Sequence, residues 1–141
     1  MTTWQRILPA DAMTVCALME AFHGDRLDER RRWETVDRCA GPDPLLEGWL
    51  LYEGIEPAGY AMLCRGYDPA LARETMRLEE LWVAPPFRRR RTGECFLAAL
   101  PGLYPGCAYV EVPSAGSAPV LRMLGYRTEA PALRAACPER K

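Results

Sequence analysis

The sequence contains a single histidine, His23, and none of its six cysteines belongs to a C-x-x-C pair. Zinc sites are usually built from paired cysteines and histidines, and disulfide frameworks are typical of shorter secreted chains. Both kinds of site are therefore disfavoured, and we expect no metal. We interpret the cysteines as small apolar core residues in a reducing cytoplasm, in preference to a redox role.

Long apolar runs and an excess of charge are also missing. No run approaches eighteen apolar residues, so we expect no membrane-spanning helix. Residues 1–24 lack a basic segment, and Pro9, Asp11 and Glu20 interrupt their apolar stretch, so we do not expect a secretory signal. Lys and Arg (18) nearly balance Asp and Glu (19). This balance disfavours binding to nucleic acid or to an anionic membrane. With neither a signal nor a membrane span expected, we expect a cytoplasmic protein.

The 141 residues are enough for one domain with its own hydrophobic core, so we predict a single domain over residues 1–141. Residues 3–8 read as a strand. Two segments then carry apolar residues at helical spacing between capping and stop signals, and they predict helices within residues 9–24 and 25–42.

The pattern changes after Pro42, where three apolar and aromatic runs, separated by Gly, Pro and Asp, predict an antiparallel meander: LLEGWLLYEG, EPAGYAMLCRGY and ETMRLEELWVAP. A short helix (GECFLAAL), a strand (CAYVEV), a helix (SAPVLRMLG, with Ser117 as N-cap) and one or two weak strands (YRTEAPALRAA) follow. The strand, helix and strand within residues 76–112 should cross over into a parallel pair. We therefore predict an α/β (α+β) fold whose mixed, mostly antiparallel sheet carries helices on both faces.

Four consecutive arginines lie between a predicted strand and a predicted helix in the stretch WVAPPFRRRRTGECF, which starts at Trp82. A helix N-terminus presents unpaired amides, and the forked guanidinium group matches phosphate oxygens. The segment Arg88–Gly93 is therefore a candidate anion site, and Gly93 would allow the backbone to approach a bulky ligand. In the alternative interpretation, the arginines are solvated or pair with acidic side chains.

From about Gly59 to Tyr126 the chain resembles the GNAT superfamily of acetyl-CoA-dependent N-acetyltransferases. In that family a strand of the form L-x-x-L-x-V-x-P precedes R/Q-x-x-G-x-G/A, which wraps the pyrophosphate of coenzyme A. This chain has LEELWVAP and then RRRRTG in register, and EGIEPAGYAML resembles the preceding strand turn. The resemblance implies a GNAT-like domain that binds acetyl-CoA as co-substrate through two strand residues, the arginine-rich loop and a serine after the next strand: Leu81, Val83, Arg88, Arg89, Arg90, Arg91, Thr92, Gly93 and Ser114.

Two positions depart from the family pattern. Arg91 replaces the central glycine of the pyrophosphate loop, where the backbone can need a positive φ that arginine adopts less readily. In the family's N-x-x-A-x-x-x-Y-x-x-x-G-F stretch, Ser114 stands at the Asn position and Leu121 at the Tyr position. That tyrosine is the general acid for the leaving thiolate in many members. The family's oxyanion donor, a backbone N–H, maps near Val83.

Acetyl transfer to an amine needs the amine in its neutral form. For an amine pKa of ~10.4, neutralisation at pH 7 costs about 4–5 kcal/mol, so a general base is useful. Glu79 and Glu80 are the candidates, because members acting on small polyamines or amino sugars often carry a similar L-E-D/E. On an ideal strand Glu80 shares a face with Leu78 and Trp82, and a bulge would change this assignment. We prefer Glu80, acting through water; in the alternative, both glutamates pair with surface arginines.

The sequence thus predicts an N-acetyltransferase that transfers an acetyl group to a primary amine of a small molecule or peptide by direct attack. A homodimer is compatible with the resemblance, because family members often dimerise. The first alternative is a CoA-binding sensor or interaction domain with weakened catalysis, motivated by Arg91 and Leu121. The second alternative, an RNA or DNA contact through the arginines, is disfavoured by the net charge and by the absence of interleaved exposed aromatic residues.

Overall fold

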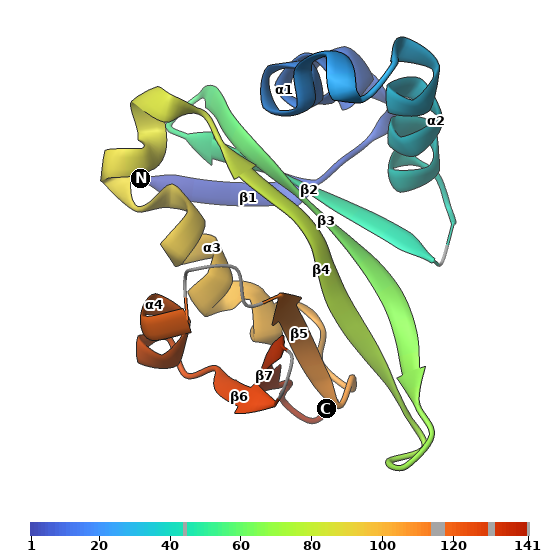
Figure 1. Cartoon of the computed structure of the whole chain (residues 1–141), viewed down its shortest axis with the longest axis vertical. Coiled ribbons are helices and arrows are strands. Elements are labelled where there is room, and N and C mark those ends of the chain that lie inside the picture. Colours follow the sequence, from blue (N-terminus) through green and yellow to red (C-terminus); the bar gives the residue numbers. More distant parts are fainter. Residues whose placement is uncertain (44, 114–117, 130–131, 141) are drawn as a thin grey trace.

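The computed structural model describes residues 1–43, 45–113, 118–129 and 132–140 (Figure 1). Within these residues seven strands form one sheet in the order β1-β2-β3-β4-β5-β7-β6. The strands are β1 (Thr2–Arg6), β2 (Leu46–Glu53), β3 (Glu56–Asp68), β4 (Arg73–Val83), β5 (Tyr109–Pro113), β6 (Arg127–Glu129) and β7 (Ala132–Ala136). The α-helices are α1 (Ala12–His23), α2 (Glu29–Ala40), α3 (Thr92–Ala99) and α4 (Ala118–Met123).

The sheet is mixed, as the sequence predicted. Strands β1 to β4 follow one another as antiparallel neighbours, and β5 pairs antiparallel with β7. Strand β5 is parallel to β4, because the chain crosses over through α3 between them. This parallel pairing covers only two positions, Met76 with Val110 and Arg77 with Glu111. The predicted crossover is confirmed, and its short pairing shapes the site described below.

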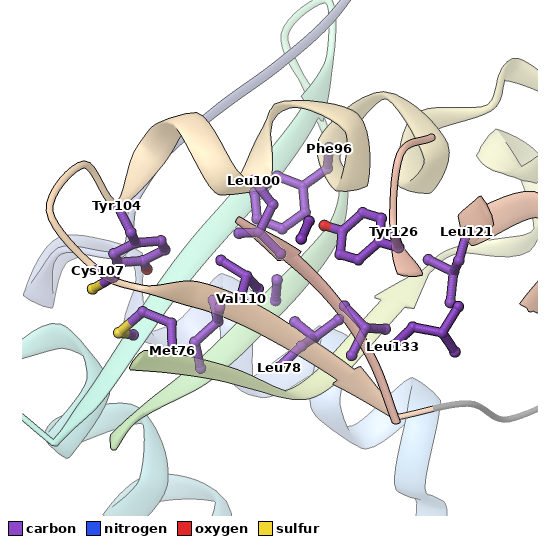
Figure 2. Packing of buried hydrophobic residues seen from close by; sticks show 14 of the residues in the cluster. Met76, Leu78, Phe96, Leu100, Tyr104, Cys107, Val110, Leu121, Tyr126 and Leu133 are labelled. Atoms are coloured by element: carbon purple, nitrogen blue, oxygen red, sulfur yellow. The ribbon is translucent and has the colours of Figure 1, made fainter. Parts of the chain in front are cut away.

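Helices cover both faces of the sheet, and each face has its own buried cluster. Helices α1 and α2 pack on one face through a cluster that includes Val15, Met19, Val36 and Tyr60. Helices α3 and α4 pack on the other face (Figure 1). Figure 2 shows this second cluster, in which Phe96 lies fully buried against the sheet. Burying such a side chain stabilises the fold by about 1.5–3 kcal/mol.

The predicted helix boundaries hold within a few residues. Asp28 caps α2, because its Oδ1 accepts a hydrogen bond from the Arg31 backbone N–H at 2.8 Å. Asp11 precedes α1 as expected, but its carboxylate accepts from the Leu8 N–H and not from the helix. Ser117, the predicted N-cap of the last helix, lies outside the described residues.

Strand β4 contains a bulge that changes which side chains share a face. Met62 pairs with Glu80, whereas the next residue of β3, Leu63, pairs with Leu78, so Glu79 is the extra residue. The ideal-strand expectation that Glu80 and Leu78 share a face is therefore wrong. Leu78 packs into the cluster under α3, and Glu80 lies on the opposite face, where its carboxylate bonds to Tyr60.

Candidate functional site

A cavity of about 430 Å³ lies beyond the short β4–β5 pairing. The parallel strands pair only near Met76 and Arg77, and past this point β4 runs on to Val83 while β5 ends at Pro113. The unpaired part of β4 and the end of β5 therefore form two sides of an opening. Its lining residues come from α1, β4, α3, β5 and α4: Phe22, His23, Leu78, Glu79, Glu80, Leu81, Leu97, Val112, Pro113 and Leu121.

Most of this lining is apolar, and the charged groups come from the bulge of β4. Leu81, Leu97 and Leu121 give an aliphatic surface, while Glu79 and Glu80 supply two carboxylates. Binding sites for small molecules commonly combine such an apolar wall with a few polar groups that orient the ligand. Consecutive residues of a regular strand point to opposite faces, but at this bulge Glu79 and Glu80 both line the same cavity.

Glu80 is the best-connected polar group of the cavity. Its Oε1 accepts a hydrogen bond from the Tyr60 hydroxyl at 2.6 Å and lies 2.6 Å from Nε2 of His23. Burial, reinforced by the adjacent Glu80 carboxylate, raises the pKa of Tyr60, so its hydroxyl remains a donor at neutral pH. His23 ends α1, Tyr60 lies in the middle of β3, and Glu80 follows the bulge of β4. Three elements thus converge on one carboxylate oxygen.

Sequence reasoning selected Glu80 but missed its two partners. His23 carried a signal, since it is the single histidine of the chain and stands just before a predicted helix stop. Tyr60 carried none, because an aromatic residue in an apolar run is most simply a core residue. The contact depends on the register of β3 against β4, which a linear pattern does not contain.

The arginine-rich segment forms a 3₁₀ helix (Pro85–Arg90) that leads directly into α3. Arg91 joins the two helices in the left-handed region, with φ 58° and ψ 31°. Arg91 therefore adopts a positive φ, a conformation that glycine takes at no cost and that is unfavourable for a residue with a Cβ.

The guanidinium groups of this segment are exposed, and most make weak local contacts. Arg88 lies 6.0 Å above the Trp82 ring, and Arg91 is 3.9 Å from the Glu94 carboxylate. Arg88 Nε also donates to the Val83 carbonyl at 2.9 Å, so the main-chain acceptor at the end of β4 already has a side-chain donor. Among the described residues no salt bridge is found for Arg89.

Thr92 and Gly93 play structural parts at the start of α3. Thr92 is fully buried, and its hydroxyl donates to Glu53 Oε1 at 3.0 Å. Hydrogen bonds from Thr2 and Thr92 hold the pKa of Glu53 below its usual value, although burial acts in the opposite direction. At Gly93 a Cβ would lie 3.4 Å from the Val83 side chain, an ordinary contact distance, so the start of α3 packs on β4 without a requirement for glycine. Thr92 thus ties the start of α3 to the buried Glu53 carboxylate.

The tyrosine of the family pattern has no replacement in the cavity. Leu121 is buried and lines the wall. Tyr126 donates its hydroxyl proton to the Leu97 carbonyl at 2.8 Å, and the Tyr104 hydroxyl accepts from the Trp49 indole N–H at 2.7 Å. Burial raises the pKa of both tyrosines, and among the described residues neither belongs to the lining. Ser114 lies outside the described residues.

Neither a cluster of metal ligands nor a membrane-spanning helix is found among the described residues. No group of three or more His, Cys, Asp or Glu side chains is arranged to hold a metal ion. None of the helices in this part of the chain combines the length and the apolar character needed to cross a bilayer.

The fold is shared with solved acetyltransferases. AAC(6')-Iy, in complex with the bisubstrate analogue CoA-S-monomethyl-acetylneamine, is 16% identical over 91% of this chain and 92% of its own, with a TM-score of 0.75. The aminoglycoside acetyltransferase meta-AAC0020, from an uncultured soil metagenomic sample and in complex with sisomicin, is 13% identical over 91% and 90%, with a TM-score of 0.73.

A third structure, from Desulfovibrio desulfuricans and assigned to the GNAT family of acetyltransferases, is 23% identical over 95% of both chains, with a TM-score of 0.63. No protein-family model matches the sequence, and no curated protein matches it either. The chain therefore shares the mixed-sheet fold of these structures. More specifically, the chain has the fold of the GNAT superfamily, as the resemblance of its sequence implied.

Proposed function

We propose that this protein is an N-acetyltransferase that transfers the acetyl group of acetyl-CoA to a primary amine. The observation that carries the proposal is the cavity between the diverging strands β4 and β5, with two glutamates at one end and the arginine-rich loop directly after β4. The GNAT fold and the positive φ of Arg91 at the position of the family's central glycine support the same function.

The residues present fit a bound acyl-CoA. Exposed guanidinium groups between Arg88 and Arg91 offer forked donors for the pyrophosphate, next to the amide groups at the start of α3. The aliphatic wall of Leu81, Leu97 and Leu121 matches an uncharged pantetheine arm. The co-substrate supplies an activated thioester carbonyl, and the backbone near Val83 is the proposed donor for its oxygen.

The acceptor amine is placed at the carboxylate end of the cavity. Glu80 holds two donors on Oε1, which leaves Oε2 for an incoming ammonium group. Glu79 also lines this end, but its Oε1 lies 3.5 Å from Arg77 Nε, so an arginine partly offsets its charge, as the alternative interpretation of the sequence had it for this residue. An amine drawn into this end reaches the carbonyl directly, and removal of its proton depends on Glu80. No acetylated side chain is needed as an intermediate.

Calorimetric titration with acetyl-CoA tests the binding half of the proposal, with desulfo-CoA and ATP as comparison ligands at low and moderate salt. We expect one saturable site that binds acetyl-CoA more tightly than ATP and weakens as salt rises, because the pyrophosphate contact is electrostatic. No binding at millimolar acetyl-CoA would contradict the proposal.

A second candidate function is a CoA-binding sensor or interaction domain with weakened catalysis. It is favoured by Leu121, which places an aliphatic side chain where the family pattern has its acidic tyrosine. General acid catalysis contributes typically ~10²–10⁴ in rate, so its loss slows a reaction without abolishing it. Turnover of a panel of small primary amines above the uncatalysed rate would reject the sensor, whereas tight binding without turnover would favour it.

A further inference from the structure

We propose that His23 accepts the proton of the acceptor amine, and that Glu80 acts as the positioning residue for its imidazole. The inference rests on the proposed acetyl transfer and specifies how the amine is deprotonated. It starts from one contact: His23 Nε2 and Glu80 Oε1 are 2.6 Å apart, and both side chains line the cavity.

The contact fixes which nitrogen of the ring carries the proton. An ionised carboxylate is an acceptor only, so Nε2 must be the donor in the neutral imidazole. Nδ1 is then the nitrogen with a free lone pair, and no hydrogen bond to it is found among the described residues. A carboxylate that holds the tautomer and orientation of a histidine base is a recurrent catalytic arrangement.

The same contacts disfavour a proton on the Glu80 carboxylate relative to one on the His23 imidazole. Its Oε1 accepts from both Tyr60 and His23, and these charge-assisted bonds are strongest while the carboxylate is ionised. A proton placed on Glu80 weakens both bonds. A proton placed on Nδ1 of His23 strengthens one of them, because a neutral donor becomes a cation next to an anion. The geometry therefore favours the imidazole as acceptor of the amine proton and Glu80 as its partner.

The charged groups near the His23–Glu80 pair are mostly carboxylates. Glu80 contacts the ring, Tyr60 donates to Glu80, and Glu79 lines the same cavity. Burial raises the pKa of the Cys39 thiol on α2, which senses the charge of Glu80, to about 12, so this group stays neutral. Arg26, in the turn after α1, donates to the backbone carbonyls of His23 and Phe22.

The proton path is balanced. The acceptor arrives as an ammonium group and first passes one proton through water to His23 Nδ1, from which the proton leaves to solvent. The neutral amine nitrogen then forms a bond to the acetyl carbon as the C–S bond breaks, and the electron pair of that bond leaves with sulfur. The second proton lost from nitrogen passes to the again neutral His23 Nδ1 and is returned to the departing thiolate through solvent. This return route needs no tyrosine, which agrees with the aliphatic Leu121 in the cavity wall.

The variant His23→Gln separates proton transfer from positioning. The glutamine amide can still donate to Glu80, but it cannot take up a proton near neutral pH. We expect kcat/KM for the acceptor amine to fall by ~10²–10³-fold at pH 7. The wild type should show a decline of kcat/KM toward acid pH, and this decline should be absent from His23→Gln. Glu20→Gln, an exposed change one turn earlier on α1, is the matched control and should stay within about threefold of wild type.

The single histidine allows a second readout that does not depend on activity. The imidazole C–H signals of the wild type in a proton NMR titration belong to His23 without further assignment, apart from any purification tag. Their midpoint should coincide with the acid limb of kcat/KM. Near-wild-type activity of folded His23→Gln, or a midpoint more than one pH unit from the kinetic limb, would overturn this inference alone. Absence of turnover in the wild type would overturn the proposed function and the inference together.

Discussion

The left-handed backbone of Arg91 gives a prediction whose size follows from its dihedral angles. A residue with a Cβ pays about 1–2 kcal/mol to adopt this region, and glycine does not. Glycine gives back about 0.5–1 kcal/mol through the greater freedom of its unfolded chain. Arg91→Gly should therefore be more stable than Arg91→Ala by about 0.5–1 kcal/mol. Both variants lose the same charge and the same exposed contact to Glu94, so that contribution cancels.

The assay is urea unfolding of the two variants and the wild type, followed by tryptophan fluorescence and checked for equal m-values. An increase of about 2 °C in Tm for glycine over alanine is the corresponding thermal result. The reference pair Arg89→Gly and Arg89→Ala should show the opposite order, because Arg89 has a negative φ within the 3₁₀ helix. Equal stability of Arg91→Gly and Arg91→Ala would refute the reasoning from the positive φ.

Three further changes test the loop, the sheet and the buried carboxylate beneath the loop. Arg90→Glu combined with Arg91→Glu should weaken acetyl-CoA binding in calorimetry and reduce the salt dependence of what remains; unchanged affinity at low salt would reject the pyrophosphate assignment. Gly59→Ala should destabilise the chain by about 2–3 kcal/mol in urea unfolding, because its Cβ would lie 2.2 Å from the Trp82 carbonyl oxygen. The lowered pKa of Glu53 stabilises the fold above the unfolded pKa and stops doing so as pH falls through the folded one. The stability advantage of wild type over Glu53→Gln should therefore be constant near neutral pH and shrink below about pH 4.3, and a pH-independent difference would contradict it.

The fold was readable from the sequence because its signals are local or periodic. Alternating apolar runs predicted the meander, and the strand, helix and strand within residues 76–112 predicted the parallel pair. The site was only partly readable. Glu80 was selected, but the bulge at Glu79 decides which face it occupies, and this depends on pairing with β3. His23 and Tyr60 reach Glu80 only through the packing of α1 and the register of two strands.

The two departures from the family pattern act on different parts of the reaction. Arg91 adopts a positive φ, as a glycine could, and adds a charge to the loop proposed to hold the pyrophosphate. Leu121 changes the chemistry of the wall, because an aliphatic side chain has no proton to give. A thiol with a pKa of ~8.5 is a good leaving group as its thiolate, so this loss bears on rate more than on feasibility. Binding of acetyl-CoA and turnover of an amine are therefore separable properties of this chain, and introducing a tyrosine should affect turnover alone.

Leu121→Tyr, assayed for both, should leave the affinity for acetyl-CoA within a few-fold, because the pyrophosphate loop is untouched. A loss of binding in a folded variant would refute this separation, because it would show that a tyrosine here displaces the pantetheine arm from the aliphatic wall.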